Sequence, residues 1–462
     1  MTRPHASTSP APRSHSNLGY ILLISLVAAF GGFLFGYDTA VVSGAIGFLT
    51  RYFDLSAELT GWAASSLLVG CMAGAMVAGP LGDRIGRKRS LILCAVLFAG
   101  SSIASALPQT LGVFAWSRFA GGIAIGAASM LSPLYIAEVS PERIRGTLVS
   151  LYQLAIVVGI LVVFFVNLQI QRLGDGAWNT EVGWRWMFAS LALPSVLFGL
   201  FLWAVPESPR WLMKMGLRDE ARSVLERISG QAGAAREVRQ IEEALRREEG
   251  RWSELFTSGY RRALIVGTVM AMFSQFSGIN AIMYFAPEIF RSAGSARDAA
   301  FVQTVTVGVV NLAFTFVAIW LVDRAGRRPL LIAGTGAQVV SLFSVGLMLD
   351  RADHGLLLLL SILAFVAAFA CSTGPITWIV ISEIFPTKLR GRAMSVAVVV
   401  LWFCDFLVTQ TFPMLRESIG PANTFWVYAF CSVMSTIFIV AMVPETRGRT
   451  LEEIEAGWRE RG

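Results

Sequence analysis

Hydrophobic residues along the chain gather into long runs that short polar stretches separate. A run of about 18 or more mostly apolar residues is long enough to cross a bilayer as a helix. Twelve such runs occur, and the first is too long for a signal-peptide core, so we expect it to be retained. The predicted spans are 20–48, 59–81, 90–107, 110–138, 146–171, 185–205, 262–290, 300–322, 329–349, 355–382, 392–415 and 422–443. The pattern predicts an all-α membrane protein.

Composition and charge support this topology and give it an orientation. Hydrophobic residues make up 55% of the 462 residues and charged residues only 15%. Of the 38 Lys and Arg residues, 30 fall in the two tails and in alternate loops that would share one membrane face. Cytoplasmic loops retain positive charge, so both termini are expected inside the cell (inner) membrane. The net charge of +7 then reflects topology and anionic membrane lipid, and we expect no nucleic-acid partner.

Several classes of function are excluded or disfavoured by what the chain contains. None of its three Lys residues follows a Gly, so a Walker A loop for ATP is impossible. The five cysteines have no paired or metal-ligand spacing, and we interpret them as packing residues. No nucleophile–base or metal constellation is evident, so we expect neither an enzyme nor a cofactor or metal.

Three motifs occur twice along the chain. "GDRIGRKR" at 82–89 returns as "VDRAGRRP" at 322–329, "AEVSPERIRG" at 137–146 as "SEIFPTKLRG" at 382–391, and "PESPR" at 206–210 as "PETRG" at 444–448. Each half holds six predicted spans, so the repeats are parallel, related by an axis along the membrane normal. The expected units are a cytoplasmic tail at 1–17, a six-helix bundle at 18–205, a cytoplasmic helical linker at 206–258, a second six-helix bundle at 259–443 and a cytoplasmic tail at 444–462.

Taken together, the motifs of this chain resemble those of the sugar porter branch of the major facilitator superfamily. They include "GYDTAVVSG", "PESPRWL", "QFSGINAIMYFAPEIF", "GPITW" and "PETRGRTLEEIE", in this order and together with the repeated motifs. The resemblance runs from about 18 to 458 and is nearest to bacterial proton-coupled symporters for monosaccharides of the xylose and hexose type. It implies a major facilitator fold, a monosaccharide and a proton as partners, and a monomer.

A carboxylate inside the first span is the main candidate for proton coupling. Asp38 lies in the apolar stretch "FGGFLFGYDTAVVSG", and Arg118 lies in the fourth span. At about 1.5 Å per residue both sit roughly 12–15 Å below the outer end of their helices, so they can pair. A lone charge there costs at least ~3 kcal/mol. The pair is either a permanent structural ion pair or, as the resemblance implies, a proton site whose Arg is alternately engaged and released.

Amide and aromatic side chains suited to a sugar fall near the predicted midplane. Amides can bond hydroxyls, and aromatic faces can cover the C–H surface of a sugar ring. The alternative is that these side chains only hold helices together. The resemblance matches family sugar-contact positions to Gln153, Gln275, Asn280, Asn311, Trp378 and Trp402, with Tyr284 as a further candidate at the outer gate.

Local features modify this expected site. Gly278 suggests a locally opened seventh span, and Gly374-Pro375 suggests the same in the tenth. Ser274 stands where relatives often have a second Gln, and Leu191 stands where some proton symporters carry an acid. Asp405 stands where an Asn is usual, and it is either an acceptor for a sugar hydroxyl or a second titrating group.

The repeated cytoplasmic motifs place complementary charges at helix ends. The resemblance implies that they form a latch which closes the inside while the outside is open. The alternative is a set of solvated, topology-setting charges, since exposed ion pairs are individually worth only ~0–1 kcal/mol. The candidate gate residues are Asp83, Arg84, Arg87, Glu138 and Arg145 in the first half, and Asp323, Arg324, Arg327, Glu383 and Arg390 in the second.

The leading hypothesis is therefore a proton-coupled importer of a monosaccharide that works by alternating access. A passive facilitator of the same fold is the main alternative, with Asp38 ionised throughout. A sugar sensor on a transporter scaffold is a third hypothesis, which the short segment after the last span disfavours. The sequence does not identify the sugar.

Overall fold

The computed structural model describes residues 17–141, 144–246, 252–351, 355–385 and 389–447, and within these ranges the chain is helical, with no strand. Twelve of its helical segments are long and apolar enough to cross a membrane. The predicted number of spans is confirmed, and most helices extend a few residues beyond the apolar runs that predicted them.

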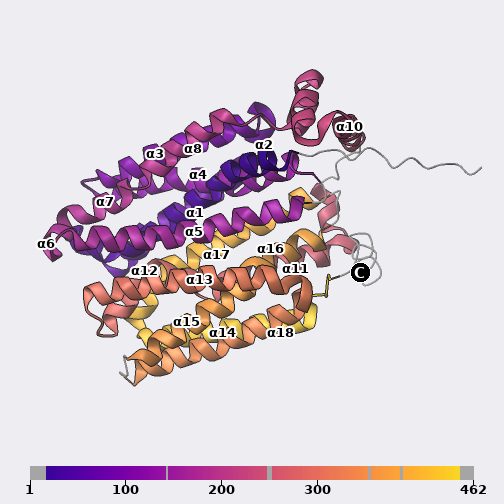
Figure 1. Ribbon diagram of the computed structural model, residues 1–462. Coiled ribbons are helices and arrows are strands. Elements are labelled where there is room, and N and C mark those ends of the chain that lie inside the picture. Colours follow the sequence, from indigo (N-terminus) through magenta and orange to yellow (C-terminus); the bar gives the residue numbers. More distant parts are fainter. Residues whose placement is uncertain (1–16, 142–143, 247–251, 352–354, 386–388, 448–462) are drawn as a thin grey trace, which may run out of the picture.

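The first six spans form one bundle (Figure 1). Asn17, Ser56 and Thr110 precede three of these helices, and each side chain accepts a backbone N–H from the first turn, so polar residues set where the helices begin. The helices are α1 (Leu18–Tyr52), α2 (Ala57–Ile85), α3 (Arg87–Ala106), α4 (Leu111–Val139) and α5 (Arg145–Arg172), followed by a sixth span built from α6 (Gly176–Trp178), a π-helical turn (Asn179–Gly183), α7 (Trp184–Ala189) and α8 (Ala192–Ala204).

The last six spans form a second bundle beside the first (Figure 1). Its helices are α11 (Ser258–Phe276), α12 (Ile279–Ser292), α13 (Arg297–Ala325), α14 (Arg327–Asp350), α15 (Leu356–Cys371), α16 (Thr373–Ile384), α17 (Arg390–Ser418) and α18 (Pro421–Met442). Between the bundles run α9 (Pro209–Lys214), α10 (Arg218–Arg246) and a 3-10 turn (Trp252–Phe256). Figure 1 places α10 at one end of the bundles.

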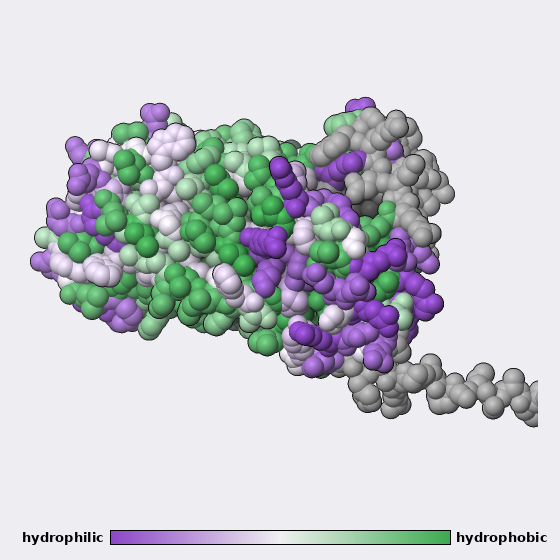
Figure 2. Space-filling view, turned by 90° about the horizontal axis from the view of Figure 1, so that it is seen from above, coloured by the Kyte–Doolittle hydropathy of each residue, from purple (hydrophilic) through white to green (hydrophobic). Residues whose placement is uncertain are grey.

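A hydrophobic band crosses the face of the first bundle. Figure 2 shows apolar residues over this band on the face of the first bundle, and hydrophilic residues concentrated at the end that carries α10. We call that end the linker side and the opposite end the far side. The described start of the chain lies on the linker side, because the backbone N–H of Asn17 donates to the carbonyl of Ile228 in α10. The band is what a bilayer requires of a multi-pass protein.

Two spans are interrupted near their middle. In the seventh span α11 ends at Phe276 and α12 begins at Ile279, with Gly278 between them at a φ of 79°. The predicted opening at Gly278 is confirmed, since a positive φ of this kind suits glycine. In the tenth span the break lies at Ser372 instead, so Gly374-Pro375 occupy the first turn of α16. A proline is tolerated there because the first-turn N–H groups have no partner within the helix.

The two bundles touch through their central helices. α2 packs against α17, α5 against α13, and α1 against α12. Near the far side, Arg172 of α5 makes a two-pronged ion pair with Asp298 of α13, at 2.7 and 2.9 Å. Near the middle, the rings of Phe35 and Trp402 lie 5.4 Å apart. These contacts join the halves at the far side and around the centre.

Candidate functional site

The predicted pair of charges inside the first bundle meets in the structure. The side chains of Asp38 and Arg118 are both essentially excluded from solvent. Nη1 of Arg118 donates to Oδ1 of Asp38, and Nη2 donates to the backbone carbonyl of Asp38 at 2.9 Å. The guanidinium also lies over the ring of Phe188, 5.1 Å from its centroid. Each charge therefore compensates the other in a region where either alone would be costly.

The second carboxylate oxygen of Asp38, Oδ2, is left without a hydrogen-bond partner among the described residues. It faces Gly121, where an added Cβ would lie 3.1 Å from it and 2.9 Å from the hydroxyl of Ser101. The contact with Arg118 is therefore made through Oδ1 and the backbone carbonyl, while Oδ2 points to Gly121 and Ser101.

Arg118 is held in position by a close crossing of α4 and α2. Gly122 of α4 faces Gly70 of α2, and Gly126 faces the backbone of Cys71, a spacing of small residues that lets two membrane helices approach closely. A Cβ added to Gly122 would lie 1.9 Å from the carbonyl oxygen of Leu67. The two backbones are thus in contact one turn after Arg118, so this crossing fixes the depth and direction of the arginine.

Four of the predicted sugar-contact residues lie together where α11, α12 and α17 meet. The amide of Asn280 donates to Oε1 of Gln275 at 2.7 Å, across the break in the seventh span. The hydroxyl of Tyr284 donates to Oδ2 of Asp405 at 3.4 Å, and Thr409 donates to Oδ1 at 3.2 Å. The set therefore draws on both parts of the interrupted seventh span and on α17.

The remaining predicted contacts surround this set less tightly. Trp402 is buried against Phe35 of the first bundle, and its Nε1 has no hydrogen-bond partner among the described residues. Asn311 is buried on α13, whereas Gln153 on α5 and Trp378 on α16 are half-buried. Among the described contacts, no hydrogen bond joins these last three side chains to the others. The structure places these three on three different helices without linking them.

Two of the departures from the family pattern can also be located. Leu191 lies in the turn between α7 and α8 and is buried, so this turn brings no acid next to the pair of Asp38 and Arg118. Ser274 accepts the amide of Gln275 at 3.2 Å and donates to the carbonyl of Ala271. A short hydroxyl thus orients the side-chain amide that follows it.

The predicted gate charges of the first half form a compact network on the linker side. Arg87 is buried and donates to both oxygens of Glu138, at 3.0 and 3.1 Å, and to Asp83 at 2.9 Å. Arg145 does not join this network: it donates to the carbonyls of Ala137 and Ser140. Arg84 is exposed. The network therefore ties α2, α3 and α4 together within one half.

The second half repeats this arrangement in part. Arg327 donates to Glu383 at 3.2 Å, the counterpart of the contact between Arg87 and Glu138. Arg324 is exposed and lies over Trp320, 4.1 Å from the ring centroid. The side chains of Asp323 and Arg390 lie outside the described part of the structure. The central Arg–Glu contact is thus common to both halves.

Each network is completed by a glutamate to which the sequence analysis gave no role. Glu207 accepts the backbone N–H groups of Arg87 and Lys88, at 2.9 and 3.1 Å, and so caps α3. Glu445 accepts those of Arg327 and Arg328, both at 3.1 Å, and caps α14. Burial would raise the pKa of Glu445, but the N–H groups that donate to its carboxylate outweigh burial and hold the pKa below its ordinary value.

The signal for these two glutamates was present in the sequence. Both belong to the repeated pair Pro-Glu, at 206–207 and at 444–445. Each glutamate caps a helix that begins right after a glycine of positive φ, Gly86 at 97° and Gly326 at 91°. A Cβ on Gly86 would lie 2.2 Å from Glu207, so glycine is required for this approach.

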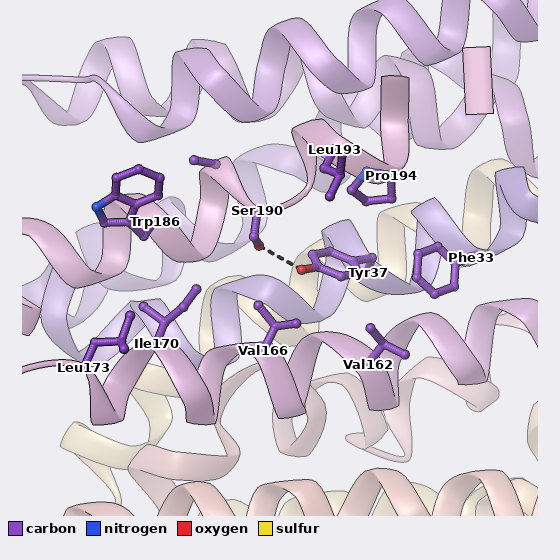
Figure 3. Close-up of a pocket in the computed structure, with 11 residues that line it drawn as sticks. Phe33, Tyr37, Val162, Val166, Ile170, Leu173, Trp186, Ser190, Leu193 and Pro194 are labelled. Atoms are coloured by element: carbon purple, nitrogen blue, oxygen red, sulfur yellow. Dashed lines mark hydrogen bonds between the residues drawn. The ribbon is translucent and has the colours of Figure 1, made fainter. Parts of the chain in front are cut away.

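A pocket of about 480 Å³ lies at the edge of the first bundle, between α1, α5 and the sixth span (Figure 3). Its lining is almost wholly apolar. Its two hydroxyls bond each other, Tyr37 to Ser190 at 2.8 Å. Trp186 and Leu193 at its mouth are largely exposed. None of the predicted sugar contacts lines it, so it is a poor site for a polyhydroxylated ligand.

Known proteins similar to this chain include bacterial sugar transporters. The arabinose-proton symporter of Bacillus subtilis is 45% identical over 97% of this chain and 97% of its own length. The D-xylose-proton symporter of Escherichia coli is 41% identical, covering 96% of each chain.

Solved structures give the same result for the fold. The inward open conformation of the xylose transporter XylE from E. coli superposes with a TM-score of 0.86, at 40% identity, over 95% of this chain and all of that one. A second structure, of XylE bound to 6-bromo-6-deoxy-D-glucose, is described as a major facilitator superfamily proton:xylose symporter. It superposes with a TM-score of 0.80, at 41% identity, over 96% of this chain and all of that one. The predicted major facilitator fold is confirmed.

A family model for sugar (and other) transporters matches residues 24–458, which is nearly the whole chain. With relatives above 40% identity along its length, the chain belongs to this sugar transporter family of the major facilitator superfamily.

Proposed function

We propose that this protein is a proton-coupled symporter that imports a monosaccharide, most simply a pentose such as arabinose or xylose. The relatives named above carry these sugars in their names. The observation that carries the proposal is the buried pair of Asp38 and Arg118, with a carboxylate oxygen left free for a proton. The hydrogen-bonding set of Gln275, Asn280 and Tyr284 supplies groups that suit a sugar.

Proton transfer to Asp38 changes the electrostatics of the first bundle. While Asp38 is ionised, Arg118 is compensated. Once a proton binds at Oδ2, Arg118 becomes a buried cation facing a neutral acid, and an uncompensated charge inside a membrane costs at least ~3 kcal/mol. Arrangements that give Arg118 water or another acceptor are then favoured. Protonation of Asp38 thus biases the equilibrium between two arrangements of the bundles, which is what coupling requires.

We further propose that the linker side is cytoplasmic, because the excess of Lys and Arg lies there. The halves contact each other at the far side and the centre, and the inward open xylose transporter superposes with the higher of the two TM-scores given above. The structure then corresponds to a state in which sugar leaves toward the cytoplasm. In the opposite state, the linker-side charges around Arg87 and Arg327, which pair within each half here, would form contacts between the halves and hold the inner ends closed. We expect a monomer without enzymatic activity.

Uptake by proteoliposomes tests this function. A proton crossing 100 mV releases about 2.3 kcal/mol, enough for roughly fiftyfold accumulation of sugar at one proton per sugar. The wild type should concentrate labelled arabinose or xylose when a proton gradient is imposed. Asp38→Asn cannot release a proton, so it should lose uphill uptake but retain sugar–sugar exchange.

Other outcomes would reject parts of the proposal. A wild type that equilibrates sugar without ever concentrating it would be a passive facilitator of the same fold. If Asp38→Asn vesicles still concentrate sugar, Asp38 is not the coupling residue. If no pentose or hexose is bound or transported, the protein is not a monosaccharide carrier.

A further inference from the structure

Asp405 is a second carboxylate inside the membrane-spanning region, and its surroundings differ from those of Asp38. It lies near the middle of α17 and is 1% exposed. Its oxygens accept only from neutral groups, the hydroxyls of Tyr284 and Thr409. The amide of Asn280 also faces it. The ion pairs found within the described residues do not include Asp405, whereas Asp38 is paired with Arg118.

The helices packed against α17 bring few titratable groups toward this carboxylate. Cys71 of α2 is near enough to Asp405, Asp38 and Arg118 to feel the charge of each. Of the two acids, Asp38 is already compensated by Arg118. Away from the helix ends the titratable groups are Cys71 on α2, Tyr284 on α12, Tyr428 and Cys431 on α18, and Cys404 on α17 itself. The other described titratable groups lie toward the helix ends: Glu58, Asp83 and Arg84 on α2, Tyr260, Arg261 and Arg262 on α11, Glu288 and Arg291 on α12, Glu383 on α16, and Arg392, Arg416 and Glu417 on α17.

A buried carboxylate with only neutral donors is poorly compensated when ionised. Three neutral donors replace part of the stabilisation that a carboxylate loses when it leaves water, but a cation would replace more of it. Asn280 beside it is only half-buried, so solvent reaches the amide next to the carboxylate, although the carboxylate itself is shielded. A sugar bound against Asn280 would displace that solvent. Sugar hydroxyls are neutral and do not replace the stabilisation that water gives an anion, so the occupied site favours the protonated acid.

We propose that Asp405 binds sugar in its protonated form, so that sugar affinity falls as the pH rises through a titration that belongs to Asp405 and not to Asp38. The inference rests on the proposed sugar site. Its proton comes from solvent, forms an O–H bond at one carboxylate oxygen, and returns to solvent when the sugar leaves. The neutral acid can donate to one sugar hydroxyl and accept from another, which an ionised carboxylate cannot do.

Equilibrium binding of labelled arabinose and xylose to the purified full-length protein in lipid nanodiscs tests this, at pH values from about 5.5 to 8.5. For the wild type, the Kd should rise with pH, approaching about tenfold per pH unit, the limit for one linked proton. Asp38→Asn should keep this dependence of the Kd on pH, because the proton linked to sugar binding is on Asp405, which this variant retains. Asp405→Asn should bind with a Kd that no longer changes with pH, because an amide has no proton to lose in this range.

A second variant guards against simple misfolding of Asp405→Asn. Thr409→Val keeps the acid but removes the donor to Oδ1, which makes the ionised form less favourable. The loss of affinity should then begin at higher pH than in the wild type.

Each contrary result has a distinct meaning. A wild-type slope in Asp405→Asn, or a wild-type Kd that does not depend on pH, refutes the role of Asp405 and leaves the symporter proposal standing. An unshifted onset in Thr409→Val also counts against it. Failure of the wild type to bind any tested pentose or hexose refutes the proposed function itself.

Discussion

The crossing of α2 and α4 should be intolerant of a single methyl group. In Gly122→Ala the new Cβ would lie 1.9 Å from the carbonyl oxygen of Leu67 and 2.9 Å from the backbone nitrogen of Cys71. Both neighbours are backbone atoms, so no side chain can rotate away. The helices would have to separate by about 1 Å, and overpacking of this kind typically costs about 1–3 kcal/mol.

The displacement should also reach the proton site. Arg118 lies one turn before Gly122 on the same helix, and its guanidinium contacts Asp38 on α1. A shift of about 1 Å at the crossing is large compared with the narrow distance range of a hydrogen bond. We expect Gly122→Ala to lower the Tm of the purified protein and to reduce proton-driven uptake more than sugar–sugar exchange.

Gly112→Ala is the matched control. Gly112 lies on α4 as well, but apart from the nearby backbone of its own helix no atom comes within 4 Å of an added Cβ. Alanine is the better helix former by roughly 1 kcal/mol, so this variant should be neutral or slightly more stable. If Gly122→Ala matches Gly112→Ala in Tm and in uptake, the close crossing does not position Arg118 and the reasoning is wrong.

Three further changes probe other parts of the molecule. Gln275→Ala and Asn280→Ala should each weaken sugar binding about fivefold or more, since each leaves a hydroxyl unpaired; unchanged Kd values in both would reject the assigned site. Arg172→Ala should loosen the far-side contact and so lower the labelling of a cysteine engineered on the linker side, and exchanging the two charges in Arg172→Asp/Asp298→Arg should restore that labelling. Unchanged labelling in Arg172→Ala would mean that this ion pair does not favour the observed arrangement. Because the pKa of Glu445 is lowered, its stabilisation is present at neutral pH and is lost as the pH falls through that lowered pKa. Glu445→Gln should thus lower the Tm at neutral pH and flatten its acid-side decline, whereas parallel Tm curves would contradict this.

Much of the architecture could be read from the sequence because a bilayer constrains it strongly. Backbone groups in hydrocarbon must be bonded within a helix, so apolar runs predicted the spans. The pairing of Asp38 with Arg118 also followed from depth alone, since few other partners exist in the membrane. Gly278 was a reliable sign of a break because its φ is positive. At Gly374-Pro375 the same reasoning misplaced the break by two to three residues, because proline is compatible with the first turn of a new helix.

Other features could not be read from sequence because they depend on how helices face one another. The glycines of α2 and α4 gave no hint of which helix each would meet. Spacing alone did not predict that Arg145 would donate to backbone carbonyls instead of to an acid. Nor did the sequence show that Asp405 would lie against Tyr284 with no cation nearby in the described residues, which leaves its two sequence-based interpretations open to experiment.

The distribution of polar contacts bears on how the two halves move. On the linker side, the contacts of Arg87 with Glu138 and of Arg327 with Glu383 each lie within one half. They stiffen the ends of the bundles without joining them. Across the halves, the ion pair of Arg172 with Asp298 is exposed to solvent, and exposed ion pairs are easily broken and remade. On the far side, Gln410 of α17 also accepts from Ser65 of α2 at 2.8 Å and donates to the carbonyl of Glu58 at 3.0 Å. Ion pairs inside each half on the linker side, with the contacts between halves kept to the far side and the centre, suit rigid-body rocking. A gate of this kind needs only a small bias, and the proposed protonation of Asp38 would supply one.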